Sequence, residues 1–306
     1  MSYLNRKRPT GSQVEVPKYR IEGKRAVVSG YQKFAVSRRD VDVSNSNYHN
    51  KFMFLRHFLI KSKMFTQSTT VSDLGCSNGL VSFLASQQGY TRVNALDHDQ
   101  ECLNLIRNVA RALGISNITP KSFKFGNPIA PSDVTLACAL IHWVYSCTAN
   151  FGSLDAIMKY LRSITNKVLL VEWVSPQDPG VKSFNHLSFK INKVKQPYNL
   201  AHFEAALKKN FAVHKRVYTT VPTRWLYVAT VEDSESTRKL FDALAQVNRV
   251  LRPAPKSAPP RPAPKPSRAK VSVSRRPLRL RKIKRVSKIG AAKGRLLKKR
   301  TVRKRR

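Results

Sequence analysis

The sequence predicts an α/β fold, a doubly wound and mostly parallel seven-stranded sheet that ends in an antiparallel hairpin. Two observations support this prediction. Between residues 70 and 174, apolar segments of strand length alternate with segments whose apolar residues recur at helical spacing. Between residues 211 and 231, two strand-like segments follow each other across a short Val-Pro turn, which is typical of a hairpin.

The alternation begins with a helix. Residues 48–62 carry phenylalanines and leucines at helical spacing. The apolar segment TVSDL (70–74) predicts a strand, and the helix after it ends at Gly89, because glycine readily takes the left-handed conformation at a helix end. RVNALD (92–97) predicts a second strand. The next helix has one apolar side and stops at Gly114, and ITPKSFKF after it predicts a third strand.

The second half of the alternation continues the pattern. DVTLACALI predicts a fourth strand and LDAIMKYLRSI a helix. KVLLVEWV (167–174) predicts a fifth strand that is apolar on both faces, as a central parallel strand should be. Residues 181–197 have the character of an insertion, and LAHFEAALKKN after them predicts a helix. The two hairpin strands are predicted at 211–220 and 223–231.

Charge divides the chain into a basic body and an extreme tail. The 306 residues include 57 Lys and Arg against 17 Asp and Glu, a formal net charge of +40. Residues 251–306 hold 23 of the basic residues and no acidic one, so the body keeps a surplus of 17. Such a surplus indicates a polyanionic partner: a nucleic acid, an acidic membrane surface or an acidic protein.

Cysteine spacing and hydropathy set further expectations. The four cysteines have no CxxC spacing and no histidine cluster beside them, so we expect reduced structural thiols in an intracellular protein and no metal site. No apolar run approaches the roughly 20 residues that span a bilayer. The first residues also lack the apolar core of a signal peptide.

The turn after the first predicted strand is the clearest candidate site. In a parallel sheet, ligands bind at the carboxyl ends of the strands, where Gly75 to Gly79 would lie. Gly75 permits a sharp turn without a Cβ, and Gly79 opens a helix whose amides point at the same space. Asp97 ends the next strand about 20 residues later, where a carboxylate can accept hydrogen bonds from ribose hydroxyls. This arrangement is typical of a nucleoside site.

The ligand class follows from two details of the turn. The sequence GCSNGL lacks the GxGxxG pattern that dinucleotides favour. Asp73, just before the first glycine, would repel a pyrophosphate but suits a cationic ligand end.

The segments DLGCSNG and VNALDHD together resemble the first two motifs of class I S-adenosylmethionine-dependent methyltransferases, a Rossmann-like family. CALIHWV and VLLVEWVSP are similar to the exits of the family's fourth and fifth strands, and the hairpin is similar to its last two strands. The resemblance covers about residues 50–232. It implies S-adenosylmethionine as cofactor, with the methionine part held by the glycine turn and the ribose by Asp97.

Two positions depart from the family pattern. Ser77 stands where the family often has its middle glycine, and the family tolerates small residues there. After the third strand the family often has an acid near the adenine. Here the segment FGNP offers Asn127, which is either an acceptor for the adenine amine or an ordinary turn residue before Pro128.

The catalytic residues are less well defined. His142, just past the fourth strand, is the candidate base that removes the acceptor's proton, or else a packing element beside the cofactor. Glu172, in the fifth strand, is either a second polar group in the cleft or a charge satisfied locally. Tyr48, His49 and Arg56 are candidates to line the mouth of the substrate site.

The methyl acceptor stays open. The Asn/Asp-Pro-Pro-aromatic turn of enzymes that methylate nucleobase amines is absent, and so is the Cys-Pro pair of 5-methylcytosine formation. The Lys-Asp-Lys-Glu set of ribose 2′-O enzymes cannot be placed either. Three functions remain: a methyltransferase tethered to nucleic acid, a methyltransferase of a small molecule or glycan, and an inactive methyltransferase-like domain that binds nucleic acid as a structural protein.

The expected domain organisation has four parts: a basic N-terminal arm (1–47), the methyltransferase domain (48–250), a Pro-rich linker (251–270) and a disordered basic tail (271–306). The tail is similar to linker-histone and protamine tails in composition only. We expect it to bind nucleic acid without sequence preference, or to act as an address, in a nuclear protein or one packaged in the virion of a large DNA virus.

Overall fold

The structure is a computed structural model that describes residues 17–148, 151–188 and 196–251. All of them lie in the first of the two units into which the chain divides, residues 1–255. The second unit comprises residues 256–306. The predicted basic tail, and the predicted linker beyond residue 251, lie outside the described residues.

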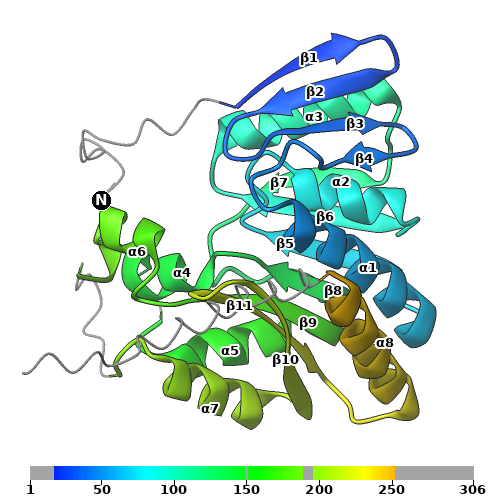
Figure 1. Ribbon diagram of the computed structural model, residues 1–306. Helices are drawn as coiled ribbons and strands as arrows, with labels where there is room; N and C mark the ends of the chain where they lie inside the picture. The colour runs from blue at the N-terminus through cyan, green and yellow to red at the C-terminus, as the bar shows by residue number, and fades with distance from the viewer. Residues whose placement is uncertain (1–16, 149–150, 189–195, 252–306) are drawn as a thin grey trace, which may run out of the picture. The chain divides into compact units, whose positions relative to one another are not determined.

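The main sheet has seven strands in the order β10-β11-β9-β8-β5-β6-β7 (Figure 1). Their bounds are β5 Thr70–Leu74, β6 Arg92–Asp97, β7 Ile118–Ser122, β8 Ser132–Ala137, β9 Thr165–Val174, β10 Val213–Val221 and β11 Arg224–Thr230. The five strands from β7 to β9 are parallel, whereas β11 pairs antiparallel with both β9 and β10. The predicted doubly wound sheet with its terminal hairpin is therefore confirmed.

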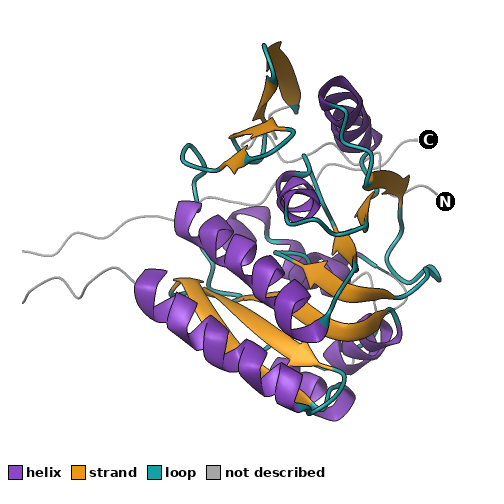
Figure 2. Ribbon diagram, turned by 90° about the vertical axis from the view of Figure 1, so that its right-hand side faces the viewer, coloured by secondary structure: helices purple, strands orange, loops and turns teal. Residues whose placement is uncertain are grey.

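Helices cover both faces of this sheet (Figure 2). They are α1 His49–Thr66, α2 Leu80–Gln87, α3 Gln100–Leu113, α4 Ile141–Cys147, α5 Leu154–Ser163, α6 Pro179–Phe184, the short 3₁₀ helix η2 His186–Ser188, α7 Leu200–Asn210 and α8 Glu235–Leu251. The five predicted helices are confirmed. The sequence patterns did not predict α4, α6 or α8.

Strand β9 shows how the sequence builds two cores. Successive side chains of a strand point to opposite faces. Val168 and Leu170 pack into one core with residues of α1, α2, α3 and α8, while Leu169 and Val171 pack into a second core with residues of α4, α5 and α7. All four are fully buried, as the uninterrupted apolar run indicates. By the same alternation, Glu172 lies on the α1 face.

A second, four-stranded antiparallel sheet occupies much of the segment predicted as the N-terminal arm. Its strands run in the order β1 (Lys18–Glu22), β2 (Arg25–Ser29), β3 (Phe34–Ser37) and β4 (Val41–Asp42). The buried side chains Ala26, Val28, Phe34 and Val36 join the core on the α2 and α3 side. Figure 1 shows this sheet in blue beside α2 and α3. The sequence patterns predicted no strands here.

Within the described ranges, no helix is both long enough and apolar enough to cross a membrane. The same residues contain no cluster of three or more His, Cys, Asp or Glu side chains placed to hold a metal ion.

Candidate functional site

The glycine turn between β5 and α2 has an unusual backbone. Gly75, Ser77 and Gly79 all have positive φ angles, of 69°, 48° and 87°. This left-handed region is costly for residues with a Cβ, so Ser77 carries strain at the position where glycine fits best. The amides of Gly75 and Cys76 donate to the carbonyl of Leu96, over 2.8 and 3.1 Å. The turn is therefore fixed to the carboxyl end of β6.

Both glycines also lie against neighbouring side chains. A Cβ on Gly79 would come within 2.6 Å of Ile106 Cγ1, so α3 packs directly on the backbone of the turn. A Cβ on Gly75 would meet the side chain of Leu140 at 3.0 Å, in the loop between β8 and α4. The turn thus lies between the ends of β6 and β8, at the edge where the fold predicts a ligand.

Asp97 ends β6 beside this turn and is nearly buried. One carboxylate oxygen accepts the amide of Ser77 at 2.8 Å, and the other accepts the amides of His98 and Asp99. Burial acts to raise the pKa of Asp97, but these hydrogen bonds and His98 outweigh it and lower the pKa. The carboxylate is therefore ionised, and the oxygen that meets Ser77 retains a lone pair for a ligand hydroxyl.

Asp73 is in β5, two residues before Gly75. Its side chain is buried and accepts a hydrogen bond of 2.7 Å from the hydroxyl of Ser82 on α2. Burial raises the pKa of Asp73 to about 6, with the negative charge of Asp97 adding to the effect and Ser82 opposing it. A cation near this carboxyl would stabilise its charged form.

The N-terminal segment covers one side of the turn. Asn78 is buried and donates from Nδ2 to the carbonyl of Gln32 at 2.7 Å. Gln32 is itself buried, and its side-chain oxygen accepts from the Ser46 hydroxyl at 2.9 Å. Sequence reasoning missed this contribution, because Gln32 stands in a short polar loop with no motif around it.

Asn127 lies in an exposed turn after β7. Its amide donates to the carbonyl of Lys124 at 3.0 Å, and its own carbonyl accepts the hydroxyl of Tyr160 at 2.7 Å. These are the contacts of a turn residue. None of the side-chain hydrogen bonds among the described residues involves its amide group.

On the α1 side, Lys51 and Glu172 form a buried ion pair. Lys51 Nζ lies 2.6 Å from Glu172 Oε2, and the two side chains are 7% and 0% exposed. Burial disfavours the ammonium, but the Glu172 charge, aided by Cys138, more than offsets it and raises the pKa of Lys51. The second carboxylate oxygen, Oε1, has no partner in the described part of the chain. Glu172 is thus held locally by a lysine that sequence reasoning did not single out.

Arg224 and Asp178 form a second, bidentate ion pair beside the first. Arg224 donates from Nε and Nη2 to the two carboxylate oxygens, each over 2.8 Å. Asp178 also accepts the Thr223 hydroxyl and caps α6. Burial acts to raise the pKa of Asp178, but Arg224 and Thr223 lower it to about 2. The Arg224 guanidinium lies 5.7 Å from the ring centre of Tyr48, which brings Tyr48 to this cluster.

His49 and Arg56 make polar contacts near the end of the N-terminal sheet. His49 Nδ1 lies 3.2 Å from the carbonyl of Val43, and Arg56 contacts the carboxylate of Asp40 at 3.2 Å and the carbonyl of Val41. Both side chains therefore fasten α1 to the end of the N-terminal sheet.

His142 is the second residue of α4, in the segment that follows the end of β8 at Ala137. Its ring is buried and lies 5.0 Å, centre to centre, from the ring of His186 in η2. Sequence reasoning missed His186, because the segment after β9 has no periodicity that would place it. The topology brings both imidazoles to the region where β8 and β9 end.

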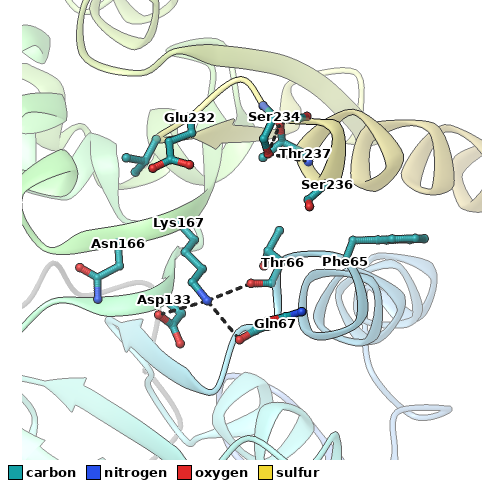
Figure 3. Close-up of a pocket in the computed structure, with 11 residues that line it drawn as sticks. Phe65, Thr66, Gln67, Asp133, Asn166, Lys167, Glu232, Ser234, Ser236 and Thr237 are labelled. Atoms are coloured by element: carbon teal, nitrogen blue, oxygen red, sulfur yellow. Dashed lines mark hydrogen bonds and ion pairs between the residues drawn. The ribbon is translucent and has the colours of Figure 1, made fainter.

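A cavity of about 510 Å³ lies at the opposite edge of the sheet, where the parallel strands begin (Figure 3). Lys167 points into it and donates to the carbonyls of Thr66 and Gln67, with Asp133 at 3.9 Å. Asp133 accepts the amides of Thr69 and Thr70. These polar groups join the end of α1 to β5, β8 and β9. The cavity thus belongs to the structural framework and not to the candidate ligand site.

No family model and no curated protein matches the sequence. Solved structures with a similar fold include WbdD, also described as a bifunctional kinase-methyltransferase, at 15% identity and a TM-score of 0.47 over 61% of this chain and 42% of that one. The chain thus spans about two fifths of the length of WbdD. A magnesium protoporphyrin IX methyltransferase from Synechocystis, with bound SAH, aligns at 14% identity and a TM-score of 0.39 over 61% and 88%.

An O-methyltransferase family protein from Burkholderia thailandensis aligns at 10% identity and a TM-score of 0.43, over 61% of this chain and 59% of that one. Identities and TM-scores this low carry no argument about what this protein does. The strand order of the main sheet, with its antiparallel last pair, is that of a doubly wound, Rossmann-like α/β fold.

Proposed function

We propose that the protein binds S-adenosylmethionine and transfers its methyl group to an acceptor. The observation that carries the proposal is the turn at Gly75–Gly79: three left-handed residues at the carboxyl edge of the sheet, fixed to β6 beside the ionised Asp97. The bound cofactor would supply a methyl group activated by a positively charged sulfur.

The residues present fit this cofactor. The open backbone of the turn would hold the methionine part, and the free lone pair of Asp97 would accept one ribose hydroxyl. Asp73, whose carboxyl is buried and readily stabilised by a cation, would face the charged end of the cofactor. Asn127, in the exposed turn after β7, remains the proposed contact for the adenine. His142 is the proposed base. Glu172, which forms an ion pair with Lys51, would be a second polar group of the site.

The test of this function is methyl transfer from cofactor labelled in the methyl group, with the full chain and fractionated RNA, DNA, protein and glycan as acceptors. We expect label in one fraction, and we expect excess S-adenosylhomocysteine to suppress it because the product occupies the same site. Cofactor binding without transfer to any fraction would favour the inactive, structural alternative.

We further propose that residues 271–306 bind nucleic acid without sequence preference. The support is compositional: the chain from residue 251 holds 23 basic residues and no acidic one, and no aromatic residue that could stack on bases. Such a chain gains affinity by releasing condensed counterions from the phosphate backbone.

Deleting residues 252–306 should therefore flatten the dependence of duplex DNA affinity on salt. Each phosphate neutralised contributes a slope of about −0.9 in a plot of log affinity against log salt concentration. Fluorescence anisotropy at four or more salt concentrations measures the slope for the full and truncated chains. An unchanged slope and affinity would show that the tail is not the nucleic-acid-binding element. Nucleic-acid binding would then belong to the basic body, and the tail would serve membrane or protein targeting.

A further inference from the structure

The region where β8 and β9 end contains a buried cluster of imidazole and indole rings. His142 comes from α4 and His186 from η2, and their ring centres are 5.0 Å apart. His186 also stacks on Trp143, with centres 3.9 Å apart and planes 18° apart. His186 is fully buried and His142 is 6% exposed, so little of either ring meets solvent.

Three ring nitrogens in this cluster lack a hydrogen-bond partner among the described residues. They are Nδ1 of His142 and both nitrogens of His186. Buried polar atoms are nearly always paired, and each exception needs an explanation. A neutral imidazole presents one donor and one acceptor, so a group that both donates and accepts can pair with either nitrogen of each ring. A hydroxyl does both.

Burial keeps both rings neutral. Burial lowers the pKa of His142 to about 3, and His186 and the guanidinium of Arg224 add to this, while Asp178 opposes it. Burial also lowers the pKa of His186 to about 4. Both imidazoles are therefore unprotonated and weakly basic at neutral pH.

We propose that His142 and His186 bind the hydroxyl group of the methyl acceptor and that His142 takes its proton, so that the protein is an O-methyltransferase. This inference rests on the proposed function. In the step, a lone pair of the acceptor oxygen forms the bond to the methyl carbon. The carbon–sulfur bond breaks, and its electron pair stays on sulfur, which becomes neutral. The proton of the hydroxyl passes to a ring nitrogen of His142 and from there to water.

Weak bases suit a hydroxyl acceptor better than an alkyl amine. An oxygen that gains a methyl group while it keeps its proton becomes a very strong acid, so even a depressed imidazole can accept that proton. An alkyl amine arrives protonated, with a pKa of about 10.4, and must lose a proton before it can attack. Imidazoles with such low pKa values remove that proton far less readily than the proton of a methylated oxygen.

The rest of the cluster supplies a surface for the body of the acceptor. Trp143 and Phe184 are half-buried, and their ring centres lie 5.4 Å apart beside the imidazoles. Partly exposed aromatic rings offer a face on which a ring or carbon skeleton packs. With His186 holding the hydroxyl, these two rings would contact the body of the acceptor.

The acceptor class is tested with the full chain, methyl-labelled cofactor and four defined polymers: an RNA of A, C and G only, the DNA of the same sequence, dextran and poly-lysine. Both nucleic acids carry phosphates at their ends, so that only the RNA has free hydroxyls. We expect label in RNA or dextran, held on the sugar, and none in DNA or poly-lysine.

Label in DNA or poly-lysine, or on the bases of the RNA, would overturn the hydroxyl assignment. So would the absence of label from both hydroxyl polymers in a protein that binds S-adenosylhomocysteine. If the protein does not bind S-adenosylhomocysteine at all, the proposed methyltransferase function itself is wrong, and the hydroxyl assignment falls with it.

The role of His186 is tested with His186→Asn, and His202→Asn on α7 is the matched control. We expect turnover to fall roughly 100-fold in the first variant and to stay unchanged in the control, with S-adenosylhomocysteine affinity kept in both. The acid limb of the rate profile should also move to higher pH, because removing His186 relieves one cause of the low pKa of His142. If His186→Asn has wild-type turnover, or lower turnover with an unmoved acid limb, then His186 has only a packing role.

Discussion

Replacing Lys51 by methionine should destabilise the protein by about 3–5 kcal/mol. The substitution leaves the Glu172 carboxylate fully buried with neither of its oxygens paired, because Lys51 is its only hydrogen-bond partner among the described residues. An uncompensated charge of this kind is among the most costly defects in a protein interior. Urea unfolding monitored by circular dichroism measures the loss as a lower midpoint at an unchanged slope.

The double variant Lys51→Met, Glu172→Leu separates the charge from the shape of the side chains. Removing both charges replaces the pair by apolar side chains of similar size, and such replacements are often neutral or stabilising. We therefore expect most of the lost stability to return. A double variant that is as unstable as the single one would show that Lys51 and Glu172 act through packing and not as an ion pair.

Gly79→Ala should cost about 3 kcal/mol and weaken cofactor binding. A Cβ at a φ of 87° adds strain of roughly 1–2 kcal/mol, and its overlap with Ile106 at 2.6 Å adds about 1–3 kcal/mol of overpacking. Thermal unfolding and titration with S-adenosylhomocysteine measure the two effects.

Gly114→Ala is the control for this variant. Gly114 has a similar left-handed φ of 65°, but a Cβ there meets nothing within 4 Å. Gly114→Ala should therefore lose only the roughly 1–2 kcal/mol of stability that comes from backbone strain. Cofactor affinity should stay the same, since Gly114 ends α3 away from the turn. Equal losses in the two variants would mean that Gly79 is constrained by its backbone angle alone.

Much of the main sheet was predictable because its segments have strong local patterns. The run KVLLVEWV could only be a strand buried on both faces, and the one-sided helix before Gly114 carried its own stop signal. The spacing between Gly75 and Asp97 likewise predicted that the two residues lie together, since Gly75 follows β5, Asp97 ends β6, and these strands pair in parallel.

The N-terminal sheet and the substrate side of the site could not be predicted in this way. Strands β2 and β3 have only five and four residues. Their alternation of buried and partly exposed side chains arises because α2 and α3 cover one face of the sheet. Lys51 is a charged residue on a predicted helix, for which exposure is the usual expectation. His186 and Arg224 come together with His142 only through the strand order. Contacts of this kind depend on tertiary structure and leave no local signal.

The most direct test of the account is calorimetric titration of the full chain with S-adenosylhomocysteine, beside the variants Asp97→Ala and Asp133→Ala. The wild-type protein should bind one equivalent. Asp97→Ala should lose roughly 10-fold or more in affinity, since a hydrogen bond to a charged acceptor contributes about 1.5–3 kcal/mol. Asp133→Ala, at the opposite edge of the sheet, should bind like wild type. No binding by the wild-type protein, or undiminished affinity in Asp97→Ala, would contradict the assignment of this edge as a cofactor site.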